Sequence, residues 1–226
     1  MSKLFSTLNI REIEFKNRIV VSPMCQYSSN DGFANEWHLV HLGSRAIGGA
    51  ALVIAEATAV SPEGRISISD LGIWKDEHIE YLQKITDFIL AHGSVPGIQL
   101  AHAGRKASRN EPWNGDKLLS PSDGGWNVVA PSDIPFSDEY ARPLALSEEG
   151  IKNIVHDFSA ATERAVRAGF RVIEIHSAHG YLIDEFLSPL ANRRTDDYGG
   201  SFENRIRLLL EIISAIRKVW PEKYPL

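Results

Sequence analysis

Short apolar runs alternate with amphipathic helical patterns four times along this chain, and this alternation constrains the fold more than any other feature. The apolar runs are rich in β-branched residues and indicate strands at residues 18–24, 51–60, 95–104 and 171–180. The segments between and after them carry apolar residues at helical spacing, at residues 35–49, 76–93, 147–169 and 201–220. Strands that alternate with helices predict an α/β fold with a parallel sheet.

Two architectures fit this alternation: a doubly wound sheet and a (β/α)8 TIM barrel. In both, ligands bind at the carboxyl ends of the strands, where this chain places Cys25, Glu56, Gln99, His176 and His179. No G-x-G-x-x-G motif follows the first strand, which favours the barrel. A barrel needs eight units and about 250 residues, whereas these 226 residues supply four. We therefore expect one domain, residues 1–226, that forms the N-terminal part of a barrel.

The composition is that of an ordinary globular protein, with 43% hydrophobic residues and a net charge of −5. It has no basic excess to suggest nucleic acid and no apolar run long enough to span a membrane. The N-terminal residues show no secretory pattern, and a single cysteine fits a reducing compartment. We expect a cytoplasmic protein with no nucleic-acid or membrane partner.

The single cysteine, Cys25, lies in the stretch VVSPMCQY at the end of the first predicted strand. A lone thiol forms no internal disulfide, and a free cysteine most often serves as a small buried apolar side chain. Its place at a strand end leaves a chemical role open.

The stretch HSAHGY, residues 176–181, is the sharpest local motif. His176 and His179 would point to opposite faces of an extended strand, and they converge only if the chain turns after His176. Gly180 makes such a turn credible. Two adjacent imidazoles can bind a metal, move protons or jointly hydrogen-bond an oxygen atom, and two packing histidines are the alternative.

Other polar residues near the strand ends carry weaker signals. Tyr181 could donate a proton beside the imidazoles, or it could simply pack. The amide of Gln99 could pair with a flat heterocycle, and a backbone-satisfied amide is equally consistent. We interpret Glu56 as a structural residue. Two further groups have both a functional and a structural interpretation: His38 with His41, and His102 with Arg105 and Lys106.

Several long motifs together resemble the old yellow enzyme family of FMN-dependent ene-reductases, in its thermophilic-like branch. They are SPMCQY, EATAV, QLAHAGRKA and IEIHSAHGYLIDEFLSPLANRRTDDYGGSFENR, and the resemblance covers essentially all 226 residues. Cysteine in the first motif and a His–His pair in the last one select the branch.

The resemblance implies a TIM barrel that binds FMN without a covalent bond and uses NADPH as reductant. By position in the motifs, the flavin would be lined by Ser22, Pro23, Met24, Cys25, Ala57 and Gln99. His176 and His179 would hold the carbonyl oxygen of an enone, Tyr27 would help position it, and Tyr181 would donate the proton. Full-length members are expected to form homo-oligomers.

The resemblance also implies parts that these four units do not supply. Barrels of this kind take their phosphate site from the loops after strands seven and eight. We therefore expect this chain alone to bind FMN weakly or not at all. Three alternatives are an inactive half-barrel, a metal-dependent hydrolase using His102, His176 and His179, and a dienoyl-CoA reductase with an iron–sulfur cluster.

Overall fold

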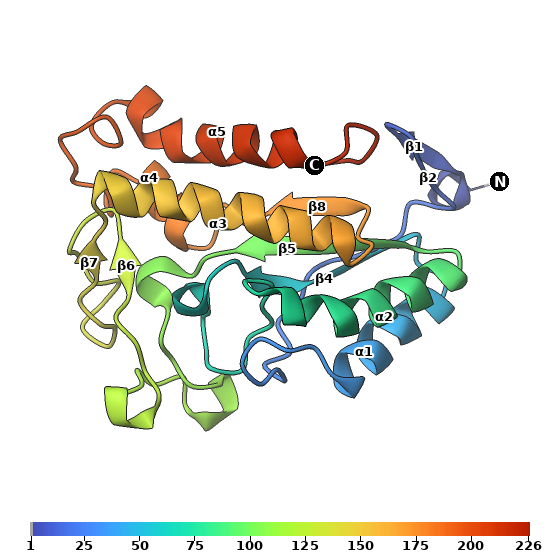
Figure 1. Ribbon diagram of the computed structural model, residues 1–226, viewed down its shortest axis with the longest axis horizontal. Coiled ribbons are helices and arrows are strands. Elements are labelled where there is room, and N and C mark those ends of the chain that lie inside the picture. The colour runs from blue at the N-terminus through green and yellow to red at the C-terminus, as the bar shows by residue number, and fades with distance from the viewer. Residues whose placement is uncertain (1) are drawn as a thin grey trace.

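A four-stranded parallel sheet forms the centre of the computed structural model, which describes residues 2–226 (Figure 1). Its strand order is β3-β4-β5-β8. The strands are β3 Val20–Val21, β4 Leu52–Ala59, β5 Val95–Ala101 and β8 Val172–Ile175. Sequential order and parallel pairing throughout confirm the predicted partial α/β barrel of about four units.

One long helix follows each strand, as the periodicity predicts. These helices are α1 Glu36–Ile47, α2 Ile79–Ala91, α3 Glu148–Arg167 and α5 Phe202–Val219. Three of these helices have an N-cap residue whose side chain accepts a hydrogen bond from a backbone N–H of the first turn. These residues are Asn35, Ser147 and Ser201. Ser147 thus caps the 20-residue helix α3.

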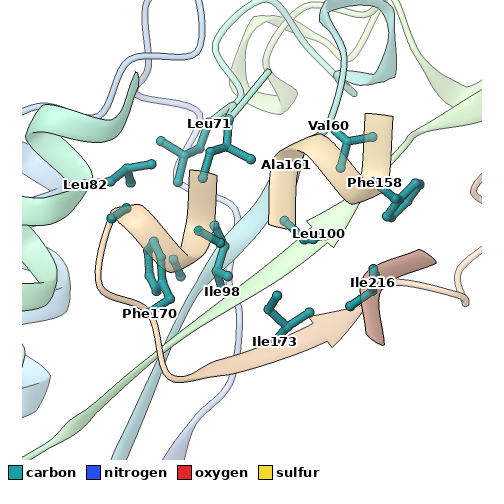
Figure 2. Close-up of a cluster of buried hydrophobic side chains, with 14 of the residues drawn as sticks. Val60, Leu71, Leu82, Ile98, Leu100, Phe158, Ala161, Phe170, Ile173 and Ile216 are labelled. Carbon is teal, nitrogen blue, oxygen red and sulfur yellow. The ribbon is translucent and has the colours of Figure 1, made fainter. Parts of the chain in front are cut away.

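The main core lies between the sheet and these helices. Figure 2 shows α3 lying across the strands, with Phe158 and Ala161 directed towards Leu100 and Ile173. Phe158, Ala161 and Leu100 are fully buried. Burial of a Phe or Leu side chain contributes roughly 1.5–3 kcal/mol, so this layer holds the strand ends at fixed positions.

Two elements were not predicted. A hairpin of β1 Leu8–Ile10 and β2 Ile13–Phe15 lies at the amino end of the sheet, where Ile13 and Phe15 pack against the inner-face residues Leu52 and Ile54 (Figure 1). A short helix, α4 Leu182–Leu187, follows the HSAHGY motif. Both are too short to give a clear periodic pattern.

Residues 105–146 form a capping segment beyond the carboxyl ends of the strands (Figure 1). It is mostly irregular and contains the paired strands β6 Val129–Ala130 and β7 Leu144–Ala145. The 3-10 turns of the chain are η1 Lys3–Phe5, η2 Pro62–Gly64, η3 Asp76–His78, η4 Gly104–Lys106, η5 Pro112–Asn114 and η6 Pro121–Asp123.

The inner face of the sheet borders a cavity of about 630 Å³. Its lining includes Leu52, Ile54, Val172 and Glu174 from the strands and Ile213 from α5. β3 and β8 each pair with one strand only, so the sheet is open at both edges. Among residues 2–226, none of the helices is long and apolar enough to cross a membrane.

Candidate functional site

An irregularity in β4 determines which residues face the interior near its carboxyl end. Ala55 pairs with Ile98 and Ala57 with Gln99, so Glu56 is an extra residue without a partner in the register. Such a bulge reverses the alternation of side chains beyond it. Glu56 consequently reaches His38 of α1, at 3.4 Å, and Ala57 takes the place beside Gln99.

The segment after β3 is held by Glu56 and α1. Oε2 of Glu56 accepts a hydrogen bond from the backbone N–H of Gln26 at 2.7 Å, and Asn35 donates to the carbonyl of Ser28 at 2.6 Å. His38 is buried and lies 3.3 Å from the hydroxyl of Ser29. Glu56 and His38 therefore act as supports for the segment that carries Cys25 and Tyr27.

The thiol of Cys25 lies in this supported segment beside β4. The backbone N–H of Ala57 and the hydroxyl of Tyr27 each act to lower the pKa of this thiol. Burial nevertheless raises the pKa of Cys25 to about 12, and the nearby carboxylates of Asp70 and Glu56 act in the same direction. The group is a neutral thiol at neutral pH, which argues against a nucleophilic role.

This pKa predicts slow alkylation of the native protein. Its rise from 9.0 to about 12 lowers the thiolate fraction at pH 8, so we expect iodoacetamide to modify Cys25 about a thousandfold more slowly in the native than in the urea-unfolded chain. Mass spectrometry of the single cysteine measures both rates, and Cys25→Ser gives the background. Equal rates in the two states would contradict the buried thiol.

Gln99 and Glu174 face the interior from the neighbouring strands β5 and β8. They are partners in the register, and the Gln99 amide donates to Oε1 of Glu174 at 2.5 Å. Gln99 is buried, at 8% exposure, whereas Ser22 and Met24 are exposed and Pro23 is half-buried. The predicted flavin-lining residues therefore lie on β4, on β5 and on the segment after β3.

A tight turn brings His176 and His179 together. His179 and Gly180 both have left-handed backbones, with φ of 61° and 73°, and the N–H of Tyr181 bonds to the carbonyl of Ala178 at 3.2 Å. Two consecutive positive φ values across such a bond define a type I′ turn. Nδ1 of His179 lies 3.2 Å from Nε2 of His176.

The geometry fixes the proton positions on both rings. The N–H of Ala178 bonds to Nδ1 of His176 at 3.3 Å, so a neutral His176 carries its proton on Nε2 and donates it to Nδ1 of His179. His176 is 7% exposed. Burial, and secondarily the charge of His179, lowers the pKa of His176 to about 4.

This shift predicts the titration of His176. Because the charged form is disfavoured, we expect its ring C–H signals in NMR spectra to titrate with a midpoint of about 4 rather than 6.5. The signals are assigned as those missing from His176→Gln. In His179→Ala the midpoint should rise but stay below 6.5, since burial is the larger cause; a wild-type midpoint above 6 would refute this electrostatic description.

Tyr181 and Tyr27 border a small enclosed cavity next to the histidines. The ring centres of His176 and Tyr181 lie 4.9 Å apart. The cavity measures about 140 Å³, and its lining also includes Lys106, Arg109 and Tyr140. Burial raises the pKa of both Tyr27 and Tyr181, with Cys25 the next cause, so both phenols keep their protons.

Other candidate residues serve structural roles. His102 is buried, and its Nδ1 accepts the N–H of Gly104 at 3.1 Å. Arg105 donates to the carbonyls of Ile134 and Pro135, at 3.2 and 3.3 Å, and thereby anchors the capping segment. Within residues 2–226 no group of three or more His, Cys, Asp or Glu side chains could hold a metal ion.

Two acidic residues of α4 contribute to the site without having been predicted. Asp184 accepts the N–H of Gly180 at 2.6 Å, and Glu185 accepts the N–H of Arg105 at 2.9 Å. Burial raises the pKa of Glu185 to about 8. Asp184 and Glu185 follow the HSAHGY motif after two apolar residues, but nothing in this spacing indicates these backbone contacts.

The fold and the site together define a class: enzymes on a parallel α/β barrel, with the reactive groups at the carboxyl ends of the strands. Residues 3–223 match the NADH:flavin oxidoreductase / NADH oxidase family, and the chain belongs to that family. The family implies FMN as the cofactor and a nicotinamide nucleotide as the reductant.

Similar proteins agree with this family. An NADPH dehydrogenase of Bacillus cytotoxicus is 53% identical over 97% of this chain and 60% of its own length. An NADH:flavin oxidoreductase of Gibberella zeae is 50% identical over the whole chain and 55% of its own length. The chain thus spans less than two thirds of these relatives.

Solved structures agree as well. Morphinone reductase has a TM-score of 0.86 and 32% sequence identity to this chain. The match covers 98% of this chain and 60% of morphinone reductase. An old yellow enzyme from a Pichia species also has a TM-score of 0.86, with 31% identity over 99% of this chain and 58% of its own. The chain is therefore an old yellow enzyme-type protein that corresponds to the N-terminal part of these relatives.

Proposed function

We propose that this chain forms the enone-binding part of an FMN-dependent ene-reductase, which uses NADPH to reduce the C=C bond of α,β-unsaturated carbonyl compounds. The observation that carries the proposal is the imidazole pair at the end of β8, of which His176 is neutral, with a protonated phenol beside it. In the whole protein, residues 1–226 would be the N-terminal part of a single barrel domain.

The interior residues fit a flavin ring. Gln99 has an amide with both a donor and an acceptor, which suits the pyrimidine edge of the ring. The bulge in β4 brings the small side chain of Ala57 beside Gln99. Ser22, Pro23, Met24 and Cys25 would line the ring from the segment after β3. Bound there, FMN would supply the hydride chemistry between NADPH and the alkene.

The two histidines would stabilise the charge that develops on the substrate. As hydride reaches the β-carbon, negative charge builds on the carbonyl oxygen, so donors aimed at this oxygen favour the transition state. His176 would donate from Nε2. His179 accepts that proton in the ligand-free arrangement, so its donation from Nδ1 requires the other tautomer.

The phenols would complete the reaction. Tyr181 keeps its proton because burial raises its pKa, and it is placed beside His176 to protonate the α-carbon. Tyr27, which also lines the 140 Å³ cavity, would help to position the enone. The low pKa of His176 keeps its ring a neutral hydrogen-bond donor throughout the physiological range.

Product formation tests the proposal. The purified protein, supplied with excess FMN and NADPH under anaerobic conditions, should convert cyclohexenone to cyclohexanone. The double variant His176→Ala/His179→Ala should form almost none, although NADPH still reduces its flavin. Equal product formation by the wild type and the double variant would refute the assigned site.

A further inference from the structure

Lys106 contacts three parts of the site. It ends the 3-10 turn η4 directly after β5. Its Nζ donates to the backbone carbonyl of His179 at 3.0 Å, and it also lies 4.5 Å from the ring centre of Phe136 in the capping segment. Its ammonium lies 5.2 Å from the ring centre of Tyr181.

The carbonyl that Lys106 contacts belongs to the central peptide of the type I′ turn. The N–H of that same peptide, on Gly180, donates to Oδ2 of Asp184 at 2.6 Å. Lys106 and Asp184 therefore hold opposite edges of one peptide plane. The orientation of this plane sets the backbone of His179, whose left-handed φ of 61° is disfavoured for a residue with a side chain.

We propose that Lys106 and Asp184 are positioning residues that clamp the His179–Gly180 peptide and thereby set the His179 ring against His176. The proposal rests on the proposed function for its catalytic meaning. A left-handed non-glycine residue persists where its surroundings over-determine it, and two charge-assisted hydrogen bonds on one peptide supply that constraint.

The supports of Lys106 come from the same helix as Asp184. Glu185, next to Asp184 on α4, accepts the N–H of Arg105 and so fixes the turn that carries Lys106. The contacts thus connect α4 to η4, η4 to the histidine turn, and the histidine turn back to α4. The ring of Phe136 lies against the Lys106 ammonium and adds the capping segment to this set of contacts. The clamp therefore links the segment that covers the site to the geometry of the two histidines.

Ring-to-ring nuclear Overhauser effects between His176 and His179 test the clamp in the chain without cofactor. Lys106→Met keeps the apolar stem and removes the ammonium, so we expect these effects to be lost and the Nδ1 shift of His179 to change. Lys106→Arg restores a charged donor and should retain them. Lys84→Met is the matched control, since it removes an ammonium 4.8 Å from the ring of Tyr81 on α2.

A second variant keeps the test decisive if Lys106→Met does not fold. Asp184→Ala releases the other edge of the same peptide and should cause the same loss of ring contact. Unchanged His176–His179 effects in either folded variant would overturn the clamp. If the ring contact is lost while cyclohexenone turnover with FMN stays at the wild-type level, the clamp stands and the proposed function fails.

Discussion

Replacing His176 with alanine is expected to lower the turnover of cyclohexenone about 10²–10³-fold, or roughly 3–4 kcal/mol in transition-state stabilisation. His176 is the better placed of the two donors, because it is buried and its tautomer is fixed by the N–H of Ala178. A donor held in position before the reaction needs no reorganisation as charge develops. Steady-state rates with saturating FMN and NADPH measure the loss.

Two further variants serve as comparisons for His176→Ala. His176→Asn retains a side-chain N–H donor and should recover part of the turnover. His156→Ala removes an exposed histidine of α3, at 79% side-chain exposure, and should leave turnover unchanged. Turnover by His176→Ala within a factor of two of the wild type would exclude His176 as the main donor to the carbonyl oxygen.

Replacing Gly104 with alanine is expected to lower the free energy of unfolding by about 2–4 kcal/mol. Gly104 has a left-handed φ of 60°, and an added Cβ would lie 2.7 Å from Cδ of the buried Glu185. The substitution therefore combines backbone strain with overlap against a buried carboxyl group that cannot move to solvent. Equilibrium unfolding in urea measures the difference.

Gly200→Ala separates the two causes. Gly200 also has a left-handed φ, of 78°, but an added Cβ would meet no atom within 4 Å. It should cost only the backbone term of about 1–2 kcal/mol. Equal losses at Gly104 and Gly200 would show that the close approach to Glu185 is unimportant for stability.

The alternation of strands and helices was predictable because each unit has a strong periodic signal, and the helix beginning at Ser147 follows from its cap. Short elements were not predictable. The first strand was expected at residues 18–24, yet only Val20–Val21 pair, because β3 has a neighbour on one side only. The hairpin β1–β2 is defined by packing against the inner face, which no local pattern records.

The candidate site was predictable in its residues more than in its geometry. Gly180 indicated the turn that joins His176 to His179, but the left-handed conformation of His179 itself depends on contacts from distant segments. The bulge at Glu56, which brings Ala57 beside Gln99, leaves no mark in the sequence. The sequence left the role of Arg105 and Lys106 open between ligand binding and loop anchoring; their backbone contacts favour anchoring.

The most direct test of the central claim is an anaerobic visible spectrum of the purified full-length protein with added FMN. NADPH should bleach the flavin bands, and cyclohexenone should then restore them at a rate that depends on the protein. That result would show that this site passes reducing equivalents to an enone. Flavin bands that bleach with NADPH but stay bleached with cyclohexenone would contradict the account.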